Sequence, residues 1–205
     1  MAPSKVLADR IFPIEGLAAD AVRIVAATVL LALCAHIVIP LPWTPVPITG
    51  QTFGVLLVGV LLGARRGAWA LGLYLLEGAA GLPVFQPLGI PGIARFVGPT
   101  AGYLISYPLA AYATGWITER ASKITLRDSG VATQSATKVG TLVAALASGE
   151  AIIFLCGCAW LASGIGLGWR TAFTQGALPF VPGEILKVAL IVLAVGGFQL
   201  ARRNS

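Results

Sequence analysis

The sequence predicts an all-α integral membrane protein, built as a single membrane domain over residues 1–205 with six transmembrane helices. Two observations predict this class. Of the 205 residues, 57% are hydrophobic and only 11% are charged, and the mean hydropathy is +0.88, which is outside the usual range of soluble domains. Since a spanning helix needs about 20 apolar residues, the chain is long enough for about six spans and leaves no room for a soluble catalytic domain.

Six apolar blocks follow one another along the chain. The first ends at Pro40, where four prolines within eight residues exclude a regular helix. The second and third flank a tight basic turn at Arg65 and Arg66, and both are short for a full span, so tilt or burial in the bundle is expected. The blocks predict transmembrane helices at about residues 22–39, 49–63, 67–80, 100–117, 139–162 and 179–200.

The segments between these blocks differ in character. Residues 81–99 contain four prolines and several glycines, and their backbone polar groups would be unpaired in lipid. We therefore expect a long loop that folds over the mouth of the bundle. Residues 118–138 form the most polar stretch and are predicted to be a cytoplasmic loop, and residues 1–21 a cytoplasmic N-terminal segment.

The positions of Lys and Arg predict the orientation, because short cytoplasmic loops retain basic residues. With both termini in the cytoplasm, Arg95 and Arg170 fall in outer loops and Lys187 in the outer half of the last helix. All other basic residues fall on the cytoplasmic side: Lys5, Arg10, Arg23, Arg65, Arg66, Arg120, Lys123, Arg127, Lys138, Arg202 and Arg203. The net charge of +6 thus reflects topology in the cytoplasmic membrane, and we expect no nucleic acid partner, since no basic patch with interleaved aromatics exists.

Several chemistries lack their sequence signatures. No Walker A run occurs, so ATP hydrolysis by this chain is not expected. His36 has no evident nucleophile partner, and the six blocks contain no Asp, which argues against an intramembrane enzyme. The three cysteines lie in apolar runs without the roughly four spaced ligands of a metal site. We expect neither catalysis nor a metal or other cofactor.

The most informative charges lie at the start of the last block. Glu184 and Lys187 are three residues apart, which brings them to one face of a helix. Charges inside a span cost a few kcal/mol and usually face a cavity or the bundle interior. Two interpretations remain open at this point: an internal ion pair with Lys187 extended toward the surface, or a pocket for a polar ligand that opens to the outside.

Arg95 supplies a second cation near the expected mouth, and an arginine fork suits a carboxylate; the alternative is an exposed loop arginine. Glu77 and Glu150 are acids near span ends, for which interfacial pairing is the ordinary explanation. Aromatic residues gather near the outer ends of the spans and predict an aromatic belt, of which one or two members could wall a pocket: Trp43, Tyr74, Phe85, Tyr103, Trp160 and Trp169.

Four segments, taken together and in this order, resemble the BioY family of biotin transporters. They are PVPIT at 45–49 followed by Gln51 and Thr52, YLLEGAAGLPVF at 74–85, GPTAGY at 98–103 and PFVPGEILK at 179–187. Members of this family are S components of energy-coupling factor transporters. The resemblance implies that the chain binds biotin from the outer face, and that a transmembrane T component and two ABC-type ATPase subunits drive uptake.

The resemblance also implies site residues. Biotin contacts of the family map onto Glu184 and Lys187 and, in the long loop, onto Arg95, with Gln86 as a candidate amide contact. Glu184 stands where an aspartate is common in relatives. Biotin's ureido ring offers two N–H donors and its tail ends in a carboxylate, so an acceptor at Glu184 and cations at Lys187 and Arg95 suit its two ends.

The family docks its T component through small residues on the first helix. Here Ala27, Thr28, Ala32 and Ala35 lie along that helix, and spacing of this type permits close helix approach. Packing against a neighbouring helix of the same bundle explains the pattern equally well. Two other functions stay open: an S component for a different vitamin, and a structural or regulatory membrane protein that transports no solute.

Overall fold

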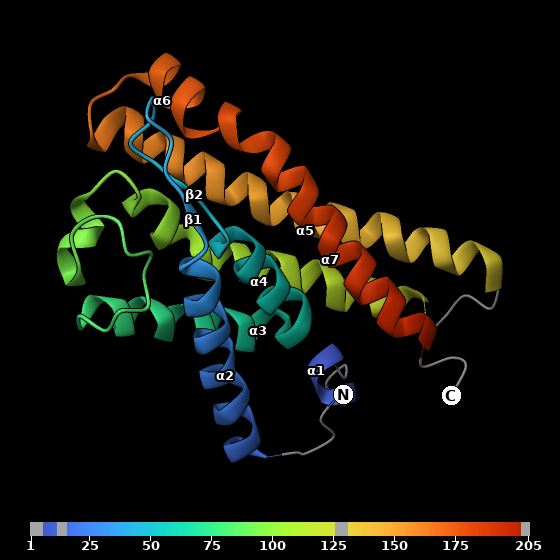
Figure 1. The fold of residues 1–205 in the computed structure, drawn as a ribbon. Coiled ribbons are helices and arrows are strands. Elements are labelled where there is room, and N and C mark those ends of the chain that lie inside the picture. Colours follow the sequence, from blue (N-terminus) through green and yellow to red (C-terminus); the bar gives the residue numbers. More distant parts are fainter. Residues whose placement is uncertain (1–5, 12–15, 126–130, 202–205) are drawn as a thin grey trace.

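The computed structural model describes residues 6–11, 16–125 and 131–201 (Figure 1). Within this part of the chain, seven α-helices and one short strand pair follow one another. The elements are α1 (Leu7–Ile11), α2 (Leu17–Ala35), β1 (Val38–Ile39), β2 (Ile48–Thr49), α3 (Gln51–Ala79), η1 (Gly92–Val97), α4 (Ala101–Thr125), α5 (Val131–Ala159), η2 (Trp160–Gly164), α6 (Trp169–Gly176), η3 (Leu178–Phe180) and α7 (Val181–Ala201).

Helix α3 carries both the second and the third apolar block and is sharply bent between them. The bend is at Gly63, whose φ of 77° is left-handed and suits glycine. A Cβ built on Gly67 would lie 3.4 Å from Gly59, although a straight helix would separate residues eight apart by about 12 Å. The two halves of α3 therefore fold back against each other, so the basic turn at Arg65 and Arg66 joins two helical segments.

The bundle is built around α3, α4 and α5, which pack against one another in that order, while α2 packs against α3 and α7 lies across α5 and α3. Close approach depends on small residues. A Cβ at Gly149 of α5 would lie 2.3 Å from the Thr114 hydroxyl of α4, so glycine is needed at this crossing. The largest fully buried side chains, Tyr74, Leu31, Leu56, Leu71 and Leu146, fill the space between these helices.

Four helical stretches of the described residues are long and apolar enough to cross a membrane: Leu17–Ala35, Gln51–Ala79, Val139–Gly164 and Trp169–Gly196. Together with many exposed large apolar side chains on α2, α4 and α7, they indicate a multi-pass membrane protein. The expected count of six helices differs from the seven α-helices described, because α1 and α6 are short additions and α3 combines two blocks.

The described part of the chain is mostly helical, and its two strands, β1 and β2, are two residues each and pair antiparallel on either side of the proline-rich loop. Two further expectations are corrected. Residues 118–138 are mainly helix: α4 continues to Thr125 and α5 begins at Val131, because Ala, Glu, Arg and Lys continue a helix readily in water. The stretch before α7, expected as a loop, contains α6. Residues 1–5 and 202–205, at the two termini that the sequence places in the cytoplasm, lie outside the described residues.

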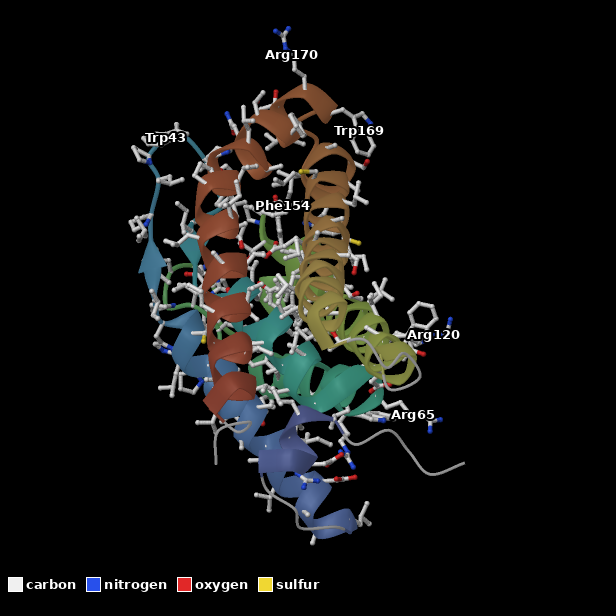
Figure 2. The ribbon with its side chains drawn as sticks, turned by 90° about the vertical axis from the view of Figure 1, so that its right-hand side faces the viewer. Trp43, Arg65, Arg120, Phe154, Trp169 and Arg170 are labelled. Carbon is white, nitrogen blue, oxygen red and sulfur yellow. The ribbon has the colours of Figure 1, made fainter. Side chains whose placement is uncertain are left out.

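The two ends of the bundle carry different side chains. Figure 2 shows Trp43, Trp169 and Arg170 at one end and Arg65 and Arg120 toward the other. The proline-rich loop reaches α6 at the first end, where the Thr44 hydroxyl donates to the Gln175 carbonyl at 2.8 Å. Helix α1 and the C-terminal end of α7 lie at the opposite end from α6 in both views.

Candidate functional site

The first turns of α7 hold the two charges that the sequence singles out. Lys187 Nζ donates to Glu184 Oε1 at 2.7 Å. The Glu184 residue is 7% exposed, so the ion pair is largely inside the bundle. An internal ion pair therefore exists, and whether it also serves a ligand depends on which of its atoms face open space.

Two threonines, Thr49 at the end of β2 and Thr52 in the first turn of α3, complete this network. Lys187 Nζ also donates to the Thr49 carbonyl at 2.7 Å and to Thr52 Oγ1 at 2.8 Å, and the Thr52 hydroxyl donates to Glu184 Oε2 at 2.8 Å. An ammonium has three donors, and all three of Lys187 are used. Lys187 thus orients Glu184 and has no N–H left for a ligand in this arrangement.

The long loop after α3 is anchored by aromatic packing and by one buried tyrosine. Tyr74 Oη accepts from Gln51 Nε2 at 2.8 Å and donates to the Val84 carbonyl at 3.0 Å. The Phe85 ring packs edge-on against Tyr74, with the ring centroids 5.3 Å apart, and against Phe96. These contacts fix the backbone on both sides of Phe85 and so place the next residue, Gln86.

Arg95 lies in η1 and is buried, with 6% of its surface exposed, so the alternative of an exposed loop arginine is wrong. Its Nη2 donates to the Gln86 carbonyl at 2.8 Å, and its Nη1 donates to the Leu88 carbonyl. The buried Nε has no partner. Burial lowers the pKa of the Arg95 guanidinium, but an arginine stays protonated in proteins. The side chain therefore keeps a charge and unused donors.

Gly89 makes room for this guanidinium. Its φ is +101°, and a Cβ at this position would lie 2.7 Å from Arg95 Nη1. Both the left-handed backbone and the close approach require glycine here. The loop is thus shaped around Arg95.

Two cavities meet beside these residues. One, of about 270 Å³, is lined by Arg95 and by the proline-rich loop before β2. The other, of about 40 Å³, is lined by Glu184, Thr52 and aromatic side chains. Pro47, Gln86 and Thr100 line both, so the two cavities adjoin. We call them together the pocket, with Arg95 at one end and Glu184 at the other. Lys187 lines neither cavity.

Aromatic side chains from three elements form the wall of the smaller cavity: Tyr103 and Tyr107 from α4, Phe154 from α5 and Phe180 from η3, just before α7. Figure 2 shows Phe154 pointing into the bundle. The rings of Phe154 and Phe180 lie 6.2 Å apart. Sequence reasoning missed Tyr107 and Phe154. A signal for Tyr107 existed, because it lies four residues after Tyr103 and hence on the same helix face.

The outer aromatic residues divide into two groups. Trp43 and Trp169 are exposed at one end of the bundle, as a membrane-interface belt requires. Tyr74, Phe85 and Tyr103 are buried and belong to the pocket or its support. Trp160 donates to the Gly98 carbonyl at 2.9 Å and so holds the end of the long loop.

The two remaining acids behave differently from each other. Glu77 Oε1 accepts from the Thr28 hydroxyl at 3.1 Å. Glu150, for which interfacial pairing was expected, is instead buried inside the bundle, and neither of its carboxyl oxygens has a hydrogen-bond partner. The expectation of interfacial pairing is wrong because Glu150 lies near the middle of the predicted span at 139–162, well inside α5.

The small residues of the first helix do not form a free surface. Ala27, Thr28 and Ala35 are buried against the rest of the chain, and Ala32 is half-buried. Of the two explanations for these residues, packing within the bundle is therefore the one that the structure favours. Partner docking at these four positions stays a prediction; of the four residues, only Ala32 is not fully buried.

The fold agrees with the comparisons to known proteins. A model of the BioY family matches residues 5–204. The chain belongs to the BioY family. The biotin transporter BioY of Rhizobium etli is 38% identical over 167 residues, which cover 82% of this chain and 85% of that protein. The biotin transporter BioY of Lactococcus lactis is 31% identical over 172 residues, covering 81% and 85%.

A solved structure also resembles this one. It is the crystal structure of the S-component for biotin from an ECF-type ABC transporter, with a TM-score of 0.73, 25% sequence identity, and coverage of 91% of this chain and 95% of that chain. The family resemblance seen in the sequence is therefore confirmed. The match extends over nearly the whole length of both chains, so the overall architecture is shared.

Proposed function

We propose that this chain binds biotin in the adjoining cavities and serves as the S component of an energy-coupling factor transporter. The family is one of transporters and not of enzymes. The observation that carries the proposal is the arrangement of charge in the pocket, with the unused donors of Arg95 at one end and the Glu184 carboxylate at the other. Biotin has a carboxylate at one end and two N–H donors at the other.

The binding mode follows from this polarity. One ureido N–H donates to Glu184, the fused ring lies against Tyr103, Tyr107 and Phe154, and the valerate carboxylate accepts from Arg95. Gln86, which lines both cavities, lies beside the valerate chain. Lys187 acts indirectly, because its three donors hold Glu184 and Thr52 in place.

Calorimetric titration of the purified protein in detergent or nanodiscs tests the proposal. Biotin should bind and raise the melting temperature, since a ligand specific for the native state stabilises it. Binding of another vitamin in preference to biotin would support an S component of different specificity. If no vitamin binds to folded protein, the chain is a structural or regulatory membrane protein and the proposal fails.

We further propose six spans in the cytoplasmic membrane, namely α2, the two halves of α3, α4, α5 and α7, with both termini in the cytoplasm. The opposite placement of Arg170 and of Arg65 with Arg120 (Figure 2) supports this orientation. In a background without the three native cysteines, Arg170→Cys should react with an impermeant thiol reagent in intact cells, and Arg120→Cys should not. Reaction at position 120 alone would reverse the orientation.

Uptake requires an energy source that this chain lacks, because its sequence has no nucleotide-binding motif. We propose a transmembrane T component and ABC-type ATPase subunits as partners. Biotin binding by the isolated chain should not depend on them, whereas accumulation of biotin in cells should stop when the ATPases are inactivated. Unchanged accumulation without the ATPases would exclude them as partners.

A further inference from the structure

The interior of the bundle next to the pocket contains two acids and one cation. Glu184 and Lys187 form one charge pair on α7. Glu150 of α5 is the second acid, and it is only 8% exposed. Both of its carboxyl oxygens are buried and have no hydrogen-bond partner.

The groups that face Glu150 come from two helices. They are Glu184 and Lys187 of α7 and Tyr107 of α4. Lys187 cannot compensate Glu150, since its three donors go to Thr49, Thr52 and Glu184. The Thr52 hydroxyl hydrogen is also used, because it points at Glu184 Oε2. Glu184, the other acid among these groups, offers only acceptors as a carboxylate.

Two neighbouring carboxylates cannot both be ionised at low cost in such a place. An unpaired charge in a low-dielectric interior is expensive, and the group normally becomes neutral instead. Two acids that share a site hold one proton between them for the same reason. Glu184 is favoured as the ionised member because it accepts bonds from Lys187 and Thr52, whereas Glu150 accepts none.

We propose that Glu150 is a proton-binding site: it is a neutral carboxylic acid in the folded protein, and its O–H donates to the Glu184 carboxylate. When Glu150 takes up the proton, the only bond that forms is the O–H bond of the acid, and solvent supplies the proton. A carboxylate has about four lone-pair sites. Donors from Lys187, Thr52 and Glu150 thus leave Glu184 with an acceptor site for the pocket.

A metal cation is a weaker candidate for the same place. Hard cations take about six oxygen ligands, and Glu150 and Glu184 supply few that are not already used. Among the described residues there is also no group of three or more His, Cys, Asp or Glu side chains that could hold a metal ion. A proton needs only the two carboxyl groups.

Infrared spectroscopy in H2O and D2O tests the site directly and without any biotin. The difference between the wild type and Glu150→Gln at neutral pH should contain one band in the region of protonated carboxylic acids, and that band should shift in D2O. A difference in the carboxylate region instead would overturn the proposal. If Glu150→Gln does not fold, Glu150→Met removes the same group with a side chain of similar length.

The pH dependence of stability gives a second test. An acid that keeps its proton when folded and loses it when unfolded stabilises the fold most at low pH, and this contribution declines as the pH rises. Between pH 5 and 8 the melting temperature of the wild type should fall relative to that of Glu150→Gln by on the order of 3 °C per pH unit. Glu77→Gln is the matched control, because Glu77 has a hydroxyl partner, and it should keep the wild-type slope.

Equal slopes for the wild type and Glu150→Gln would contradict the proposal. So would a stabilisation of the wild type by added Na⁺ or K⁺ that Glu150→Gln abolishes, because a cation would then occupy the site. Neither measurement depends on biotin. A protein that binds no biotin but shows both signatures would refute the proposed function and leave the proton site intact.

Discussion

The two ends of the pocket are built in different ways. At the Glu184 end, side chains from two helices hold one another: Thr52, Lys187 and Glu184 form a closed set of hydrogen bonds. At the Arg95 end, a single guanidinium is held by the backbone carbonyls of Gln86 and Leu88 within one loop. The first end is fixed by tertiary structure and the second by local structure.

The two kinds of construction suit two different parts of biotin, the rigid ureido ring and the flexible tail. Helices that cross at close range fix a carboxylate in a definite direction, as recognition of a ureido group requires. A loop that is ordered around its own arginine, with Gly89 to admit it, can adjust to a flexible tail. Substitutions at the two ends should therefore differ both in magnitude and in which part of biotin they affect.

The largest effect is expected for Glu184→Ala. This change removes the acceptor for the ureido group and leaves Lys187 as a buried charge without its partner, so affinity for biotin should fall by at least about 100-fold. Biotin amidated at the valerate should be weakened by the same factor, since it shares the ureido end. Calorimetry with both ligands measures this, and Glu77→Gln serves as a control with native affinity. Near-native binding by folded Glu184→Ala would remove Glu184 from the site.

Arg95→Ala should have the next largest effect. Loss of charge-assisted hydrogen bonds should weaken biotin about 10- to 100-fold, and the amide much less, so that the two ligands bind with similar affinity. Arg95→Lys should restore little, because an ammonium lacks the planar fork. An equal loss for biotin and its amide would mean that Arg95 only orders the loop.

Thr52→Val should weaken biotin and its amide alike by about tenfold. The methyl group leaves Glu184 without one donor and Lys187 without one acceptor, at a cost typical of an unsatisfied buried group. Thr52→Ser keeps the hydroxyl and should bind nearly as the wild type does, which separates loss of the hydrogen bonds from loss of packing. Similar affinities of the Val and Ser variants would show that the hydroxyl does not position Glu184.

Gln86→Ala should have the smallest effect, about threefold or less. Its backbone carbonyl, which is what Arg95 contacts, remains in place. The variant loses the amide beside the valerate chain and the acceptor of the Leu88 backbone N–H, which Gln86 Oε1 accepts at 2.8 Å. Comparison with Arg95→Ala measures how much of the loop's role lies in the backbone. A loss as large as that of Arg95→Ala would make the Gln86 side chain a direct ligand of the carboxylate.

Local patterns in the sequence predicted the parts of this pocket that are local in structure. Glu184 and Lys187 share a helix face because of their spacing, and they do contact each other. The apolar blocks predicted where the long helices lie. They could not show that polar residues after residue 118 continue the helix, because the blocks were defined by hydrophobicity and not by helix propensity.

Contacts across the bundle were beyond reach of the sequence. Thr52 meets Glu184 over a separation of 132 residues, and no local signal marks that pairing. The sequence also could not show which neighbour the small residues of α2 contact. Ala27 and Thr28 could face a partner or the bundle, and the position of α3 shows that they pack inside the bundle. Glu150 was expected to pair at the interface although it lies near the middle of the predicted span at 139–162, and α5 places it inside the bundle.

The bend of α3 at Gly63 is closed by a side chain from another helix. Glu119 Oε1, near the end of α4, accepts the backbone N–H of Ala64 at 2.9 Å, where the second half of α3 begins and its own N–H groups lack intrahelical partners. A carboxylate at the positive end of a helix is favourable. If α4 slid along α3, this hydrogen bond would break and the second half of α3 would lose its N-terminal cap. We therefore expect α3 and α4 to move together as a rigid unit in any motion that delivers the bound ligand.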